Sequence, residues 1–280
     1  MGLIDAHVHV WTPDTAHYPL AKGFDKKDMK PASFTPKELF GHCKPAGVDR
    51  VNLIQMSYYG FDNSYMLDMI KLHKDVFVGT AVIDPAGADP AKEMTSLAGK
   101  GVRAFRIYPK MSKEPIARWL QPAGFEKMFA QAAKNNQAIS CLIDPDAFPE
   151  IDRMCKKHPT APVIIDHMAR IGVNGTIADK DVKALVELAK HKRVMVKIGA
   201  FYALGKKKAP YTDLGDLIQA LVKAFGPERC MWESDCPFQV VEGHRYADSI
   251  GLIETKLKFL TAGDREWLLR KTAEKFFFPA

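Results

Sequence analysis

Long apolar runs are absent from this sequence of 280 residues: no stretch of about 18 apolar residues appears, which argues against a membrane span. The opening segment "MGLIDAHVHVW" lacks a basic region and is interrupted by Asp5, His7 and His9, which argues against a signal peptide. The five cysteines form no CxxC pair, and an odd number does not suit a disulfide framework. We therefore expect reduced thiols and a cytoplasmic protein.

A recognisable nucleic-acid-binding pattern is also missing, although the chain is basic. Its 40 basic and 33 acidic side chains give a formal charge of +7. Part of the excess lies in two short runs, "KGFDKKDMK" (22–30) and "GKKKAP" (205–210), neither of which lies on an aromatic platform or a recognition helix. These runs are either solvated loops or the source of a field that draws an anionic substrate toward a cleft. We expect no nucleic-acid and no membrane partner.

Strand-like and helix-like segments alternate along the chain. Short apolar, β-rich runs predict eight strands, at 3–10, 48–57, 76–84, 102–108, 138–144, 162–168, 193–200 and 229–235. Helical patterns lie between them, at 63–74, 125–136, 181–192 and 214–226. This alternation is typical of a parallel sheet whose faces are covered by helices.

Eight strands in a chain of this length favour a closed (β/α)8 TIM barrel over an open doubly wound sheet. No GxGxxG follows the first strand, which removes the usual sign of a dinucleotide-binding fold. No linker rich in Pro, Gly and Ser divides the chain, so we expect one domain over residues 1–280. Residues 264–277 predict an amphipathic last helix packed on the barrel exterior.

Chemistry-bearing side chains gather at the predicted strand ends, where barrel enzymes place their active sites. His7 and His9 have the same strand parity, so both should face the interior at the end of the first strand. The last strand ends at Asp235, and closure of the barrel makes it the neighbour of the first. A carboxylate beside two imidazoles can bind a metal or act as a general base on water. His167, at the end of the sixth strand, either holds a leaving oxygen or polarises a carbonyl, or it is a hydrogen-bonded core residue.

Several motifs in register resemble the amidohydrolase superfamily, and within it the amidohydrolase-2 branch. They are "DAHVHVW" (5–11), "GFDNSYMLD" (60–68), "GVRAFRIY" (101–108), "VIIDHMAR" (163–170) and "MWESDCP" (231–237). Within that branch the chain looks like the 2-pyrone-4,6-dicarboxylate lactonases and sugar-lactone hydrolases. The resemblance implies that Asp235 takes the proton from the attacking water, while His7, His9 and His167 surround the substrate carbonyl.

Many superfamily members hold a divalent metal through the first-strand histidines, a fifth-strand histidine and the last-strand aspartate. Here the fifth strand reads "AISCLIDPDAF", in which Cys141 and Asp144 are the residues with ligand atoms. His7, His9 and Asp235 remain as a three-ligand set that could bind zinc with water in the open position. The pyrone lactonases, which this chain resembles in lacking the fifth-strand histidine, work without a metal. The expected cofactor is therefore none, or one divalent metal ion with zinc as the first candidate.

The last-strand motif departs from the pattern of the relatives, which usually show Gly-Ser-Asp-Trp-Pro. Glu233 replaces the glycine and shares the parity of Asp235, so we expect it deeper in the barrel and paired with a base such as Lys197. If it were unpaired, it would raise the pKa of Asp235 through like-charge repulsion. Cys236 replaces a large aromatic residue and lacks a dedicated base, so a nucleophilic role is not expected.

Basic and aromatic side chains near the mouth are the candidates for substrate binding: Arg106, Lys110, Arg170, Tyr58 and Tyr202. Arginine binds carboxylates in a bidentate manner, which suits a carboxylated lactone. For the tyrosines, packing is the alternative role. Arg103 has the opposite parity to Arg106 and is expected to face the helices.

The leading hypothesis is a hydrolase that opens the ester of an acidic lactone, a pyrone-dicarboxylate or a sugar-acid lactone, with water activated by Asp235. One alternative is a metal-dependent decarboxylase of the same branch, which needs a firmly held metal. Another is a barrel that binds an anionic ligand without turning it over, for which a buried carboxylate beside two imidazoles is a costly arrangement. The metal content and the oligomeric state, a homo-oligomer included, stay open at this point.

Overall fold

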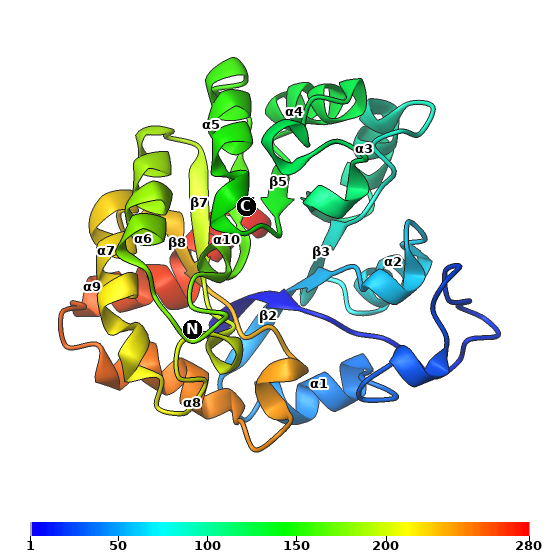
Figure 1. The fold of residues 1–280 in the computed structure, drawn as a ribbon. Coiled ribbons are helices and arrows are strands. Elements are labelled where there is room, and N and C mark those ends of the chain that lie inside the picture. The colour runs from blue at the N-terminus through cyan, green and yellow to red at the C-terminus, as the bar shows by residue number, and fades with distance from the viewer. Residues whose placement is uncertain (1, 280) are drawn as a thin grey trace.

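Eight parallel strands follow one another around a barrel in the computed structural model, which describes residues 2–279 (Figure 1). The strands are β1 (Leu3–Val8), β2 (Val48–Ile54), β3 (Phe77–Ala81), β4 (Val102–Ile107), β5 (Ala138–Cys141), β6 (Val163–Ile165), β7 (Val194–Ile198) and β8 (Cys230–Trp232). Just beyond β1 and β8, the amide of His9 donates to the carbonyl of Cys236 (2.8 Å) and that of Asp235 to the carbonyl of His7 (3.0 Å). These bonds close the barrel, and the expected (β/α)8 architecture is confirmed.

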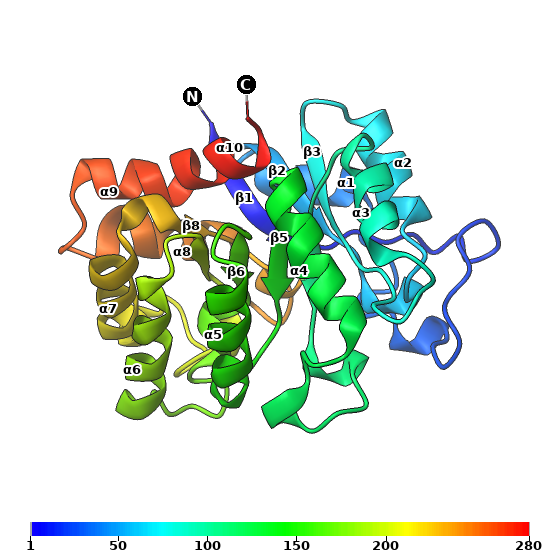
Figure 2. The same ribbon diagram turned by 90° about the horizontal axis from the view of Figure 1, so that it is seen from above.

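Helices surround the strands (Figures 1 and 2). They are α1 (Pro36–Cys43), α2 (Ser64–Leu72), α3 (Pro90–Ala98), α4 (Ala123–Asn135), α5 (Phe148–Lys157), α6 (Asp179–Glu187), α7 (Gly215–Phe225), α8 (Tyr246–Gly251), α9 (Ala262–Glu266) and α10 (Thr272–Phe277). The sequence pattern located α2, α4, α6 and α7, but did not locate α1, α3 or α5. The sequence does contain start signals for α1 and α3, because the N-cap residues Thr35 and Asp89 are followed directly by Pro36 and Pro90.

The strands end earlier along the chain than the sequence predicts. β6 ends at Ile165 and β8 at Trp232, so that Asp166, His167 and Asp235 lie in the turns that follow. His167 and Asp235 have φ angles of +52° and +61°, in the left-handed region. Such conformations cost about 1–3 kcal/mol in residues other than glycine, and they persist where the surrounding structure holds them. The turns aim both side chains back over the mouth of the barrel.

The end of the chain closes the amino-terminal end of the barrel, which corrects the expected helix on the exterior. Residues 264–277 form the end of α9, a π-helical segment (Trp267–Lys271) and α10. Phe277 is fully buried in one apolar cluster with the inward-facing Ile4, Ile164 and Met231. Figure 2 shows α10 lying across the end at which β1 begins. The strands leave an apolar interior open at that end of the barrel. Burying this apolar surface favours placing the last helix across the opening, as a plug, and not on the outer surface.

Within residues 2–279, no helix is both long enough and apolar enough to cross a bilayer. All five cysteines are buried as free thiols, as the spacing of the cysteines predicted.

Candidate active site

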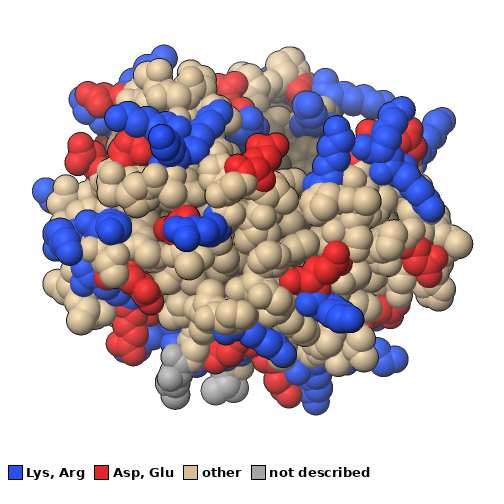
Figure 3. All heavy atoms as spheres, turned by 90° about the horizontal axis from the view of Figure 1, so that it is seen from below, with Lys and Arg blue, Asp and Glu red and all other residues tan. Residues whose placement is uncertain are grey.

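A cavity of about 920 Å³ opens at the carboxyl ends of the strands. His9, Arg106, His167 and Asp235 contribute to its lining, together with residues of the loops that follow the strands. The molecular surface shows a hollow with Lys and Arg side chains along part of its rim (Figure 3). The location agrees with the general rule for barrel enzymes.

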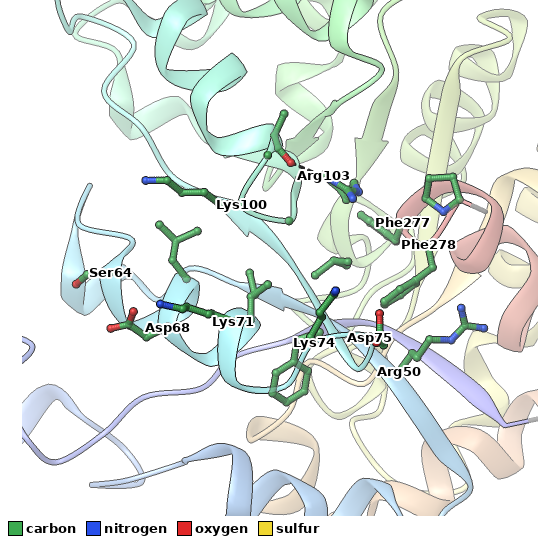
Figure 4. Close-up of a pocket in the computed structure, with 18 residues that line it drawn as sticks. Arg50, Ser64, Asp68, Lys71, Lys74, Asp75, Lys100, Arg103, Phe277 and Phe278 are labelled. Atoms are coloured by element: carbon green, nitrogen blue, oxygen red, sulfur yellow. Dashed lines mark hydrogen bonds between the residues drawn. The ribbon is translucent and has the colours of Figure 1, made fainter.

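A second cavity, of about 1050 Å³, lies outside the barrel between α2 and the segment joining α3 to β4 (Figure 4). Lys71 and Lys100 extend toward one side of it and Arg50 toward the other, where Arg50 donates to Glu274. Arg103 also lines this cavity and donates to the carbonyl of Ala98 at 3.1 Å, so it faces the helices as its parity predicted. The basic groups of this outer cavity do not converge on one point.

Three side chains from the two ends of the chain converge at the seam between β1 and β8. His7 Nε2 lies 3.2 Å from His9 Nε2. Asp235 Oδ1 lies 3.5 Å from His7 Nε2 and 3.4 Å from His9 Nε2. All three residues are buried, so these groups interact in a medium that screens charge poorly.

The hydrogen-bond partner of His9 determines where its proton lies. His9 Nδ1 is 3.0 Å from the carbonyl oxygen of Ile54, which can only accept. Burial lowers the pKa of His9, so the ring is neutral and its one proton is on Nδ1. The lone pair of His9 Nε2 therefore points at His7 and Asp235.

Asp235 has one oxygen engaged and one free. The hydroxyl of Tyr202 donates to Asp235 Oδ2 at 2.6 Å. Asp235 Oδ1 is buried and has no hydrogen-bond partner among residues 2–279. Burial opposes ionisation, but the nearby charge of His167 above all holds the pKa of Asp235 well below its usual range. The carboxylate is therefore ionised and its free oxygen faces the two imidazoles.

His167 is held between an acid and a base. Its Nδ1 donates to Glu233 Oε1 at 2.6 Å, and its Nε2 lies 3.2 Å from a guanidinium nitrogen of Arg106. Burial lowers the pKa of His167, but the charges of Glu233 and Asp235 outweigh that effect and raise it. Burial likewise opposes ionisation of Glu233, yet the positive charge of His167 lowers its pKa to about 2. Glu233 is therefore an ionised partner of His167.

Lys197 does not take the role expected of it as the partner of Glu233. Its ammonium lies 3.0 Å from Asp166 Oδ1 and 3.0 Å from His7 Nδ1. Asp166 also contacts Arg106, at 3.3 Å, and accepts a hydrogen bond from Ser140 at 2.8 Å. The sequence placed Asp166 at a strand end but could not show that it joins two buried cations.

Most of the expected substrate-binding residues line the cavity. They are Arg106, Lys110, Arg170 and Tyr202. Arg170 contacts Asp144 at 3.4 Å and stays partly exposed. Tyr58 lies elsewhere: it is buried, its ring packs edge-on against Trp11 at 5.4 Å, and it does not belong to the cavity lining. The structure thus gives Tyr58 the packing role, because the loop after β2 turns its ring toward Trp11.

Asp5 is the site residue whose role the sequence did not reveal. Its buried carboxylate accepts hydrogen bonds from the amide of His7 at 3.1 Å and the amide of Ser234 at 2.9 Å, and also from the hydroxyl of Tyr246. The acid therefore ties the backbone of β1 to the segment after β8, which fixes the separation of His7 and Asp235. An acid two residues before the first histidine of an apolar strand was the available signal.

The donor set at the seam fits one divalent metal ion. One ligand atom each from His7, His9 and Asp235 lies within 4.8 Å of the others. The free oxygen of Asp235 and the lone pair of His9 Nε2 point to the same place, as metal ligands do. His7, His167 and Glu233 form a second such group. On β5, the hydroxyl of Ser140 donates to Asp166, so it is not free to act as a further metal ligand.

Two curated relatives cover most of the chain. A 4-sulfomuconolactone hydrolase of Rhizobium radiobacter is 25% identical over 236 residues, which are 84% of this chain and 76% of the relative. An L-fucono-1,5-lactonase of Burkholderia ambifaria is 24% identical over 246 residues, or 86% and 82% of the two chains.

Solved structures share the fold over almost the whole length. A probable 2-pyrone-4,6-dicarboxylic acid hydrolase of Acinetobacter baumannii, with citric acid bound, matches with a TM-score of 0.79 and 19% identity over 99% of both chains. An amidohydrolase of Burkholderia multivorans, with zinc bound, matches with a TM-score of 0.82 and 20% identity, again over 99% of both. The model of the amidohydrolase family matches residues 4–278, and the chain therefore belongs to that family.

Proposed function

We propose that this protein hydrolyses the ester of an acidic lactone, with Asp235 as the general base. The observation that carries the proposal is the free, buried Oδ1 of Asp235 beside the Nε2 atoms of His7 and His9. The names of the curated relatives, a sulfomuconolactone hydrolase and a fuconolactonase, support lactones as the substrate class. The site also buries the carboxylates of Asp166, Glu233 and Asp235 in one cluster. The desolvation free energy of such a cluster is a high cost for a site that only binds a ligand.

The chemistry begins with a water molecule that donates to Asp235 Oδ1 while its oxygen faces the lactone carbonyl. As the new carbon–oxygen bond forms, the water proton passes to Asp235 and negative charge develops on the carbonyl oxygen. Donors from His7 and His167 stabilise that oxyanion. When the tetrahedral intermediate collapses, the ring carbon–oxygen bond breaks and the leaving oxygen takes the proton back from Asp235. The products on one open chain are an alcohol and a carboxylic acid, which loses the second water proton to solvent as the carboxylate.

Basic side chains at the mouth orient the substrate. Lys110 and Arg170 line the cavity and keep exposed charge, so they can bind the carboxylate of the lactone. Arg106 is buried and held by Asp166 and His167, so it contributes a fixed positive charge close to the reacting carbonyl. Fixing the lactone in this way supplies the proximity that an ester hydrolysis needs.

If a divalent metal binds, we assign it to His7, His9 and Asp235, with zinc as the first candidate. The bound zinc of the structural relative from Burkholderia multivorans and the free donors of this site support that assignment. The ion would polarise the carbonyl and lower the pKa of water. The protein residues keep their roles in orienting the substrate and holding the proton.

The test is turnover of a lactone panel by the wild-type protein and by Asp235→Asn. The panel contains 4-sulfomuconolactone, L-fucono-1,5-lactone and 2-pyrone-4,6-dicarboxylate, and acid release and carbon dioxide release are both recorded. We expect acid release, and a fall in kcat of about 10²–10⁴-fold in Asp235→Asn, the usual worth of a positioned base.

Asp75→Asn is the matched control. Asp75 lines the outer cavity and has a φ of +70°, a conformation that asparagine accepts readily. This variant removes the same charge and should keep full turnover. Near-normal kcat in Asp235→Asn contradicts the role of the base. Release of carbon dioxide would favour a decarboxylase, and recovery of every lactone unchanged would favour a binding protein.

A further inference from the structure

Lys197 is a buried cation that the proposed hydrolysis does not use directly. It lies on β7 with no exposed surface, and its ammonium reaches across the barrel interior to β1. The Nζ atom is 3.0 Å from His7 Nδ1 and 3.0 Å from Asp166 Oδ1. An ammonium can only donate hydrogen bonds, so His7 Nδ1 must accept this one.

A second group competes for the same nitrogen. Glu233 Oε2 lies 3.1 Å from His7 Nδ1, and a carboxylate could accept a proton from it. However, Glu233 Oε2 makes no hydrogen bond to His7 Nδ1. This oxygen has no hydrogen-bond partner in the described part of the chain. Lys197 is thus the hydrogen-bond partner of His7 Nδ1 in this structure.

The far side of the ring agrees with this assignment. A neutral imidazole carries one proton, on one of its two ring nitrogens. If Nδ1 accepts from Lys197, that proton is on Nε2, which lies 3.2 Å from the lone pair of His9 Nε2. Donation therefore runs in one direction, from Lys197 to His7, from His7 to His9, and from His9 to the carbonyl of Ile54.

We propose that Lys197 is a positioning residue that holds His7 in the tautomer protonated on Nε2. In that form the one N–H of His7 points at His9 Nε2, and His7 is not ready to bind a metal, since metal ligation needs the Nε2 lone pair. Zinc would require the proton to move to Nδ1, toward Glu233, while Lys197 gives up its hydrogen bond. The tautomer does not depend on the proposed function; only a role of this N–H toward a lactone carbonyl rests on that function.

Ring-nitrogen NMR on the histidine-labelled, metal-free protein measures the tautomer. Long-range ¹⁵N–¹H correlations distinguish Nδ1–H from Nε2–H rings, and His7→Asn assigns the signal. In the wild-type protein we expect His7 to be protonated on Nε2. In Lys197→Met, which replaces the donor with an apolar side chain of similar length, we expect the proton on Nδ1.

Zinc affinity, measured by competition with a chromophoric chelator, is the second readout. We expect Lys197→Met to bind zinc about ten-fold or more tightly than the wild type, because the Nε2 lone pair of His7 becomes available. Changes of about this size, usually losses, follow replacement of groups that contact metal ligands. Lys110→Met is the matched control, because it removes the same charge from the rim of the same cavity without touching His7. Its zinc affinity should stay close to that of the wild type.

Protonation of wild-type His7 on Nδ1 overturns the proposal, and so does a zinc affinity in Lys197→Met that equals the control or falls below the wild type. Asp166 keeps Arg106 and Ser140 as partners in that variant, which favours folding. If the variant does not fold, the wild-type tautomer decides by itself. If no lactone is turned over, the tautomer and the affinities still stand, so the two proposals fail separately.

Discussion

Asp5→Asn tests the electrostatics of the seam between β1 and β8. Asp5 is fully buried, and burial raises the pKa of its carboxyl from 3.8 to about 6, although hydrogen bonds from Ser234 and Tyr246 oppose the rise. The asparagine oxygen can accept the same two amide hydrogens, from His7 and Ser234, and its NH₂ can donate to the hydroxyl oxygen of Tyr246. The substitution therefore removes the ionisation and keeps the hydrogen-bond geometry.

The sign and the size of the effect follow from the two pKa values. The folded state holds the Asp5 proton more tightly than the unfolded state, so the contribution of Asp5 to stability is fully present below pH 3.8 and is lost as the pH rises through 6. A difference of roughly two pKa units corresponds to about 3 kcal/mol in total, of which about 1.4 kcal/mol falls between pH 5 and pH 8. The asparagine side chain does not ionise, so the free energy of unfolding of Asp5→Asn does not fall in this way as the pH rises.

Urea unfolding of both proteins at pH 5 and at pH 8 measures the effect. We expect the free energy of unfolding of Asp5→Asn, relative to the wild type, to be higher at pH 8 than at pH 5 by about 1.4 kcal/mol. Other titrating groups are present in both proteins and largely cancel in this comparison. A difference between the proteins that does not change with pH, or that moves in the opposite direction, refutes the account of Asp5 as an acid destabilised by burial.

Three further substitutions test other contacts. Tyr202→Phe removes the donor to Asp235 Oδ2, and because the carboxylate loses its orientation we expect kcat to fall about ten-fold with little change in KM; equal steady-state constants argue against this role. In Gly199→Ala the new Cβ would lie 2.1 Å from the backbone oxygen of Glu233, so Glu233, the partner of His167, must shift, and we expect a loss of turnover of at least about ten-fold. Phe277→Ala empties the apolar plug at the amino-terminal end and should cost about 3–5 kcal/mol in urea unfolding, whereas a cost below about 1 kcal/mol contradicts the plug.

Much of the fold could be predicted because it depends on local patterns. β-rich runs at regular intervals identified eight strands, and chain length favoured closing them into a barrel. The strand ends were less predictable: "PVIIDHM" reads as a continuous run, but the chain leaves β6 after Ile165 and enters a left-handed turn at His167. Hydrophobicity does not report on φ, so the turn is invisible in the pattern. The last helix was misplaced because an amphipathic face shows that a helix is packed without showing against what.

The candidate site, like the fold, could be predicted in part. The order of the motifs predicts that His7, His9, His167 and Asp235 lie close together, and the structure places them around one seam. The sequence predicts Tyr58 at the mouth because this residue follows a strand, but the path of the loop turns its ring onto Trp11. A residue in a loop can be placed only when the path of the loop is known.

The order of residues shows which chemical groups are available, and strand periodicity predicts that they meet at one end of a barrel. Which of these groups bond to one another depends on the folded chain. Lys197 and His7 are 190 positions apart, and the competing acid, Glu233, lies within 3.1 Å of the same nitrogen. Which of the two bonds to that nitrogen depends on angles set by barrel closure and by the turns after β6 and β8. Strand parity describes the face of a side chain, but hydrogen bonding depends on distances of a few tenths of an ångström, which only the folded chain provides.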